Sequence, residues 1–216
     1  MSPEDFVALL GRERASAIVR TDDQNLAAAA MEAAIAGGFR VVEFTLTVPG
    51  VFDLVADFAR RDGVVVGAGT ILTVDEARRA VDAGARFLVS PVTDEAVIAA
   101  AGALGVAMMP GTHTPTEMLR AHHAGAQLVK LFPAPAGGPL WLRSLLAPLP
   151  FLKVVPTNGV DADNVGAWLE AGAWAAGFAK SLFDPGDLAA GRFNRIEERA
   201  RTILAQTRPE APVAVG

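Results

Sequence analysis

Lys130 has the surroundings that most favour chemistry in this 216-residue chain. It lies in the middle of Gln127–Pro133, a largely apolar run that ends at a proline and has the length and composition of a buried strand. A buried ammonium is unfavourable unless its charge is paired or lost. In one interpretation the side chain extends to the end of the strand and keeps its charge in water. In the other, burial lowers the lysine pKa and frees the amine to attack a carbonyl group.

An internal near-repeat relates Glu43 to Lys130. A helix end, a glycine and a strand recur four times, at Gly38, Gly84, Gly125 and Gly172. When these copies are aligned on their glycines, Glu43 and Lys130 take equivalent positions, five residues after the glycine. In a (β/α)8 barrel, alternate strands contribute to the same layer of inward side chains. The register therefore predicts that a carboxylate and an amine meet in one pocket.

Strand-like and helical patterns alternate along the whole chain. Strands are predicted at residues 15–19, 41–44, 64–66, 87–89, 106–109, 128–131, 152–155 and 174–178. Strict alternation predicts an α/β protein with a parallel sheet, and the repeat favours a closed (β/α)8 TIM barrel over its main competitor, a doubly wound sheet. A short N-terminal helix begins at Ser2-Pro3, and a charged helix is predicted at 193–205. We expect one domain over residues 1–208 and a disordered tail over 209–216.

The loops that follow the strands hold further candidate residues, because barrel enzymes build their sites there. Gly67-Ala68-Gly69-Thr70 lacks the third glycine of a dinucleotide fingerprint, since position 72 is leucine. It is predicted to be a turn where backbone approaches a ligand and Thr70 offers a hydroxyl group. The loops at 156–161 and 177–181 follow the seventh and eighth strands, where this fold usually binds phosphate. Lys180 adds a positive charge there, or is simply an exposed surface lysine.

Composition excludes several classes of function. The chain has no cysteine, so disulfides, thiolate catalysis and cysteine-based zinc sites are excluded. A net charge of −5 argues against nucleic acid as a partner. The sequence contains no uncharged apolar run of about eighteen residues and no secretory pattern at its start, so we expect no membrane partner and a cytoplasmic location. No histidine–carboxylate spacing resembles a metal site, and none is expected.

Six segments, in order between residues 6 and 183, resemble the family of 2-keto-3-deoxy-6-phosphogluconate (KDPG) and 4-hydroxy-2-oxoglutarate (KHG) aldolases. They are Val42–Pro49, Gly67–Thr70, Val89–Pro91, Met109–Gly111, Val129–Pro133 and Val155–Gly159. These are class I enzymes, which form a Schiff base with the substrate. The resemblance implies that Lys130 forms the imine and that Glu43 transfers protons. It further implies a homotrimer without a cofactor.

The resemblance implies that Arg20, Thr70 and Pro91 line the pyruvyl pocket. We also expect Thr47, Phe132, Gly159 and Lys180 to bind the substrate. Thr47 stands where many members have an arginine, so we expect Arg20 and Thr70 to bind the substrate carboxylate. Asn158-Gly159 replaces Gly-Gly and Ala179-Lys180 replaces Gly-Ser of members that bind phosphate. Lys180 then substitutes a charge for lost amide contacts, or the site prefers another aldehyde.

The resemblance predicts a lyase that reversibly cleaves a 2-keto-3-deoxy sugar acid to pyruvate and an aldehyde. KDPG, which gives glyceraldehyde 3-phosphate, is the foremost candidate, and KHG or 2-keto-3-deoxy-6-phosphogalactonate is the alternative. Two other hypotheses are a phosphosugar isomerase or epimerase, with Glu43 as base and Lys130 only electrostatic, and a catalytically silent binder of small molecules. A covalent adduct between Lys130 and pyruvate is expected only for the aldolase.

Overall fold

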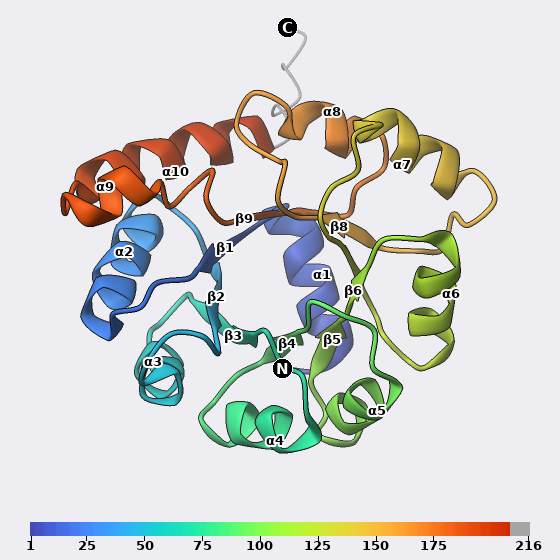
Figure 1. Ribbon diagram of the computed structural model, residues 1–216, viewed down its shortest axis with the longest axis horizontal. Coiled ribbons are helices and arrows are strands. Elements are labelled where there is room, and N and C mark those ends of the chain that lie inside the picture. Colours follow the sequence, from blue (N-terminus) through green and yellow to red (C-terminus); the bar gives the residue numbers. More distant parts are fainter. Residues whose placement is uncertain (208–216) are drawn as a thin grey trace, which may run out of the picture.

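The computed structural model describes residues 1–207, in which helices and strands alternate (Figure 1). The predicted tail at 209–216 lies outside the described residues. The strands are β1 Ala15–Val19, β2 Val41–Thr45, β3 Val65–Gly69, β4 Phe87–Val89, β5 Ala107–Met109, β6 Gly111–Thr112, β7 Val129–Leu131, β8 Val154–Pro156 and β9 Ala176–Phe178. The helices are α1 Pro3–Glu13, α2 Gln24–Ala36, α3 Val51–Phe58, α4 Val74–Asp82, α5 Glu95–Ala103, α6 Pro115–His123, α7 Gly138–Leu146, α8 Val165–Glu170, α9 Pro185–Ala189 and α10 Phe193–Thr207.

The strands form two parallel sheets that curl inside the helices. One sheet has the order β5-β4-β3-β2-β1-β9, and the other has the order β6-β7-β8. A single parallel bridge between Thr157 and Gly177 lies where β8 and β9 approach one another. Figure 1 shows α2 to α8 and α10 arranged around the outside of the strands. The predicted α/β fold with parallel strands is confirmed.

The predicted strand at 106–109 is present as β5, but the loop predicted after it contains a further short strand, β6. β5 pairs with β4 through Met109, whereas β6 pairs with β7 from Gly111 onward. Pro110 separates them, and a proline has no N–H group to donate to a strand ladder. The Pro110 carbonyl still accepts a hydrogen bond from the Lys130 amide at 2.9 Å. The chain therefore passes from one sheet to the other at this proline.

The prediction of a turn at Gly67–Gly69 is wrong. β3 continues through Gly69, and its register pairs Gly67 with Glu43 and Gly69 with Thr45. A Cβ atom added at Gly67 would lie 2.5 Å from the ring of Phe87 on the neighbouring strand. Glycine in a strand often marks such a close approach. The glycines of β3 therefore make room for side chains of neighbouring strands.

Helix α1 covers the amino-terminal ends of the strands. Its first turn is stabilised by a capping box between Ser2 and Asp5, with Pro3 at the first helical position. Its buried face packs against the first residues of several strands, and the rings of Phe6 and Phe87 stack with their centres 4.3 Å apart. Figure 1 shows α1 across the centre of the strands. Loops surround the opposite, carboxyl-terminal ends of the strands.

Helix α9 is anchored to α10 by the buried carboxylate of Asp187. Arg192 Nε and Arg199 Nη2 donate to its two oxygens at 2.7 and 2.6 Å. Asp184 caps the start of α9 by accepting from the Asp187 amide at 2.9 Å. These contacts fix the short helix that follows β9. None of the helices within residues 1–207 is long and apolar enough to cross a membrane.

We expect Phe6→Ala to lower the free energy of unfolding by about 3–5 kcal/mol, because it removes a fully buried ring from the interior beneath α1. Urea unfolding followed by circular dichroism measures this change. Leu140→Ala on α7 is the matched control, since Leu140 is 72% exposed and its loss should change stability by less than about 0.5 kcal/mol. Equal unfolding midpoints for the two variants would contradict the packing role of α1.

Candidate active site

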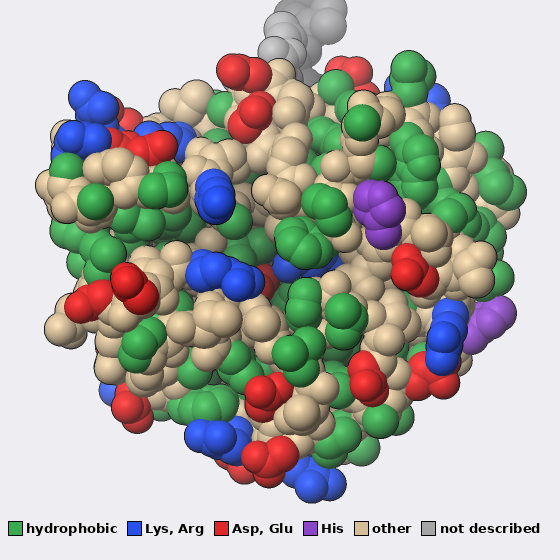
Figure 2. Space-filling model, viewed as in Figure 1, with side chains coloured by type: hydrophobic (Ala, Val, Ile, Leu, Met, Phe, Trp, Pro, Cys, Tyr) green, Lys and Arg blue, Asp and Glu red, His purple; other side chains and the backbone are tan. Residues whose placement is uncertain are grey.

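A cavity of about 450 Å³ lies at the carboxyl-terminal ends of the strands. Six of the nine predicted site residues line it, namely Arg20, Thr70, Pro91, Lys130, Phe132 and Lys180. They come from the ends of β1, β3, β4, β7 and β9. Figure 2 shows a hollow near the centre of this face with Lys and Arg side chains beside it. Residues far apart in the sequence are thus brought to one opening.

The other three predicted residues lie around this cavity without lining it. Glu43 is buried, with 1% of its surface exposed. The Thr47 hydroxyl is hydrogen bonded to the hydroxyl of Thr45 at 2.8 Å, and Thr45 does line the cavity. A Cβ atom at Gly159 would face Ala134 at 3.3 Å. Thr47 and Gly159 are therefore placed to support the site and not to form its wall.

The backbone of β7 holds Lys130 in place. Lys130 pairs with Gly111 on one side and with Val155 on the other. Its carbonyl oxygen accepts a hydrogen bond from the Thr112 hydroxyl at 3.0 Å. Its Nζ atom lies 5.0 Å from the centre of the Phe132 ring. The lysine is thus fixed in the middle of a short strand, with its amine facing an aromatic ring.

Burial favours the uncharged form of Lys130. The residue is 8% exposed, which rules out the interpretation that its ammonium extends into bulk water. Burial lowers the pKa of Lys130, and the positive charge of Arg20 acts in the same direction. The charge of Glu43 opposes this shift. Burial and Arg20 thus favour the amine form of Lys130, which carries a nucleophilic lone pair.

Burial likewise favours the uncharged form of Glu43. Among the described residues, neither of its carboxyl oxygens has a hydrogen-bond partner. Burial raises the pKa of Glu43, while the positive charges of Lys130 and Arg20 act against the rise. An unpaired carboxylate in such a place is strongly unfavourable, and a protonated acid is much less so. Burial thus moves Glu43 toward the protonated acid and Lys130 toward the free amine.

Arg20 and Thr70 form a polar pair at the opposite wall. Arg20 Nη2 donates to Thr70 Oγ1 at 3.2 Å. Thr70 has a φ angle of 65°, in the left-handed region that a β-branched residue rarely adopts. Asn158, also in the cavity wall, has a φ angle of 62°. Backbone strain of this kind is concentrated at functional sites, where the surrounding structure holds it.

Several residues that line the cavity were not predicted from the sequence. Thr45 and Thr157 each lie two residues beyond an inward-facing residue, Glu43 or Val155, so strand alternation could have placed both. The Thr157 hydroxyl is buried and has no hydrogen-bond partner within the described residues. Phe183 and Leu188 follow β9, and no local pattern predicts that they reach the cavity. The wall on this side is largely apolar.

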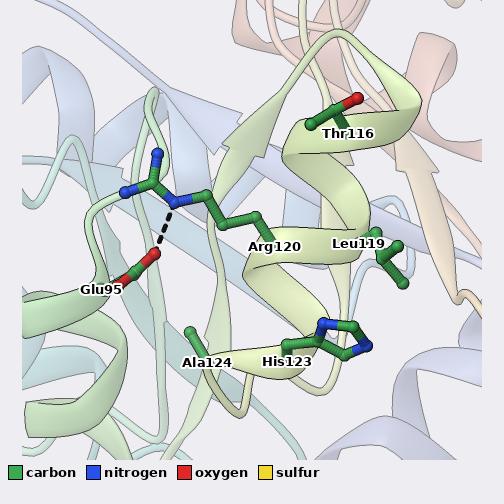
Figure 3. A pocket seen from close by; sticks show the side chains of 6 residues that line it. All are labelled: Glu95, Thr116, Leu119, Arg120, His123 and Ala124. Atoms are coloured by element: carbon green, nitrogen blue, oxygen red, sulfur yellow. Dashed lines mark hydrogen bonds and ion pairs between the residues drawn. The ribbon is translucent and has the colours of Figure 1, made fainter.

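Two other hollows lack this combination of groups. One, of about 390 Å³, lies between α5 and α6 on the outer surface, where Arg120 forms an ion pair with Glu95. Figure 3 shows the ring of His123 pointing away from that ion pair. The other, of about 820 Å³, lies beside α1 and includes Lys153, whose Nζ atom is 5.3 Å from the Trp174 ring centre. Neither contains a buried lysine beside a buried carboxyl group.

Two named relatives match most of the chain. The protein named "Probable 2-dehydro-3-deoxy-6-phosphogalactonate aldolase" of Rhizobium meliloti (strain 1021) is 36% identical over 176 residues, which cover 80% of this chain and 81% of that protein. The 2-dehydro-3-deoxy-phosphogluconate aldolase of Treponema pallidum (strain Nichols) is 32% identical over 197 residues, which cover 90% and 94% of the two chains.

A solved structure has the same arrangement of elements. The KDPG aldolase of Legionella pneumophila, with pyruvate captured at low pH as a covalent carbinolamine intermediate, matches with a TM-score of 0.80. It is 25% identical, and the match covers 91% of this chain and 97% of that one. The family model described as KDPG and KHG aldolase matches residues 8–199. Nearly the whole described chain is included, and the protein is a lyase that belongs to the KDPG and KHG aldolase family.

Proposed function

We propose that this cavity cleaves a 2-keto-3-deoxy sugar acid through a Schiff base, with Lys130 as the nucleophile and Glu43 as the group that moves protons. The observation that carries the proposal is the burial of these two groups together at one end of the strands. Burial shifts both pKa values toward the uncharged forms, an amine and an acid. Imine formation needs both forms, because the amine attacks and the departing hydroxyl group takes up a proton.

The reaction begins when the Lys130 amine attacks the keto carbon and gives a carbinolamine. Glu43, in its acid form, supplies the proton with which the hydroxyl group leaves as water, so an iminium ion remains. The Glu43 carboxylate, directly or through one water, then removes the proton from the hydroxyl group at C4. The C3–C4 bond breaks, its electron pair moves to the iminium nitrogen, and the aldehyde departs. The enamine takes a proton at C3, and hydrolysis releases pyruvate and the free amine.

We assign the carboxylate of the keto acid to Arg20 and Thr70. A guanidinium group binds carboxylates through parallel N–H donors. Arg20 reaches the cavity from the end of β1, and its hydrogen bond to Thr70 orients it there. Thr47 contributes a hydroxyl group bonded to Thr45 and carries no charge, so Arg20 supplies the positive charge at this end.

We assign the aldehyde end of the substrate to Lys180, whose ammonium group is suited to a phosphate or carboxylate. Lys180 and Asn158 both line the cavity. KDPG is the foremost substrate in this proposal. The name of the 36% identical relative supports 2-keto-3-deoxy-6-phosphogalactonate as an alternative, and KHG is a third candidate with a carboxylate at this end.

We also propose that the two sheets close into one (β/α)8 barrel within a single domain. The junction at Pro110 and the bridge between Thr157 and Gly177 support closure. A homotrimer is supported by a match, with a TM-score of 0.80 and 30% identity, to a cage designed by fusing symmetric oligomeric domains. That match covers 89% of this chain and 71% of that chain. A cytoplasmic location fits substrates whose charges oppose passage through lipid.

Lys130→Ala should abolish covalent trapping by pyruvate and borohydride, because the attacking amine is lost. Intact-mass and peptide mass spectrometry measure the reduced adduct. The sequence contains only two other lysines, Lys153 and Lys180, so the modified position can be assigned without ambiguity. Lys153→Ala is the matched control and should be trapped like the parent protein. A parent protein that forms no adduct would favour the isomerase or silent-binder hypothesis.

Glu43→Gln should lower the rate of KDPG cleavage at least about 100-fold, because the amide keeps the shape of the side chain but cannot exchange a proton. Coupled detection of pyruvate measures this rate. The variant should still be trapped on Lys130 when it is incubated with pyruvate for long periods. Cleavage within about threefold of the parent rate would show that another group moves the proton.

The rate of imine formation should rise with pH through the pKa of Lys130, and the midpoint should lie below the ordinary lysine value of 10.5. Arg20→Met should move this midpoint upward, because a nearby positive charge disfavours the ammonium form and its removal restores that form. Trapping rates at a series of pH values and saturating pyruvate measure both midpoints. A midpoint that moves downward in Arg20→Met would contradict the assignment of this charge effect.

A further inference from the structure

The carboxyl group of Glu43 occupies the space that a side chain on Gly69 would take. A Cβ atom added at Gly69 would lie 1.8 Å from Glu43 Oε1 and 2.6 Å from Glu43 Cδ. Real Cβ atoms essentially never approach another heavy atom within 3.0 Å. The carboxyl group and a Gly69 side chain are therefore mutually exclusive in this position.

Backbone conformation does not explain the glycine at position 69. Gly69 lies within β3 and is paired with Thr45, and its φ angle lies outside the left-handed region. Any residue can adopt such a conformation, and glycine in a strand weakens it. What glycine provides at this position is empty space.

Packing, and not hydrogen bonding to the described residues, orients the Glu43 carboxyl group. Neither of its oxygens has a hydrogen-bond partner among the described residues, and the side chain is almost fully buried. A group held by hydrogen bonds would keep its direction if one neighbour changed. A group held only by the shape of its surroundings turns when that shape changes.

We propose that Gly69 is a positioning residue whose missing side chain forms the seat that directs the Glu43 carboxyl group at the imine on Lys130. The proposal rests on the proposed role of Glu43 in proton transfer. In Gly69→Ala the strand keeps its path, and the flexible end of Glu43 turns away from the new methyl group. Folding is then preserved while proton transfer is lost.

Gly67 provides a matched control on the same strand. A Cβ atom at Gly67 would lie 2.5 Å from the ring of Phe87, which stacks on Phe6 beneath the site. Gly67→Ala therefore disturbs the packing under α1 but leaves the seat of Glu43 open. Its effect should fall on stability more than on proton transfer.

The experiment follows exchange of the pyruvate methyl protons with D₂O by NMR. In this exchange the carboxylate removes a proton from C3 of the pyruvyl iminium, and the resulting enamine takes up a deuteron. No aldehyde is needed, so the unidentified leaving group does not matter. Borohydride trapping at saturating pyruvate and thermal unfolding are measured on the same samples.

Gly69→Ala should exchange at least about 100-fold more slowly than the parent, while the final extent of trapping on Lys130 after long incubation and the unfolding temperature change little. The double variant Gly69→Ala/Glu43→Asp should exchange about tenfold faster than Gly69→Ala alone, because the shorter acid fits beside the methyl group. Glu43→Asp in the parent should be slow, which makes the two changes non-additive.

Exchange by Gly69→Ala within about threefold of the parent would overturn the proposal, as would a double variant no faster than Gly69→Ala. If Gly69→Ala does not fold, the double variant Gly69→Ala/Glu43→Asp decides the question. Failure of the double variant to fold as well would overturn the proposal, because the methyl group then disrupts the strand itself and not the position of the acid. Recovery of folding and of proton exchange in the double variant would support the proposal that Gly69 makes room for the Glu43 carboxyl group. A parent that neither traps pyruvate nor exchanges its protons would instead overturn the proposed function.

Discussion

The arrangement of this protein depends on keeping an amine and a carboxyl group buried in the same interior. Charged groups in such a place lose the stabilisation of water, and their mutual attraction only partly restores it. The uncharged forms of Lys130 and Glu43 avoid that loss. The surrounding apolar strands therefore do more than stabilise the fold, because they shift the pKa values of both groups toward their uncharged forms.

The elements around the pair maintain this condition from several directions. Helix α1 and the stacked rings of Phe6 and Phe87 exclude water from the amino-terminal ends of the strands. Gly69 of β3 leaves the volume that the Glu43 carboxyl group fills. Arg20 lies nearer the opening, where its charge stays hydrated and acts on both groups from a distance. Lys130 and Glu43 are thus buried, whereas Arg20 is exposed.

The sequence carried much of the fold because the signals were local and repeated. A lysine inside an apolar strand, and a glutamate at the equivalent position of an earlier repeat, were sufficient to place both groups on inward faces. The assignment failed at Gly67–Gly69, where glycine was interpreted as a turn residue. Glycine is required at these positions because the side chains of Phe87 and Glu43 on adjacent strands fill the space. A local sequence pattern does not contain this information. Phe183 and Leu188 escaped notice for the same reason, since only tertiary packing brings them to the cavity.

Helix α1 has a kinetic consequence. Because it covers the amino-terminal ends of the strands, the reaction proposed for this cavity would release both of its products toward the loops at the carboxyl-terminal ends. With Lys130 as the proposed nucleophile, the three-carbon fragment would still be bonded to the enzyme when the aldehyde forms, so it could not leave first. The proposal therefore requires ordered release, with the aldehyde before pyruvate. In the direction of synthesis the same geometry requires pyruvate to enter first, and an excess of aldehyde would block the entrance to the free amine.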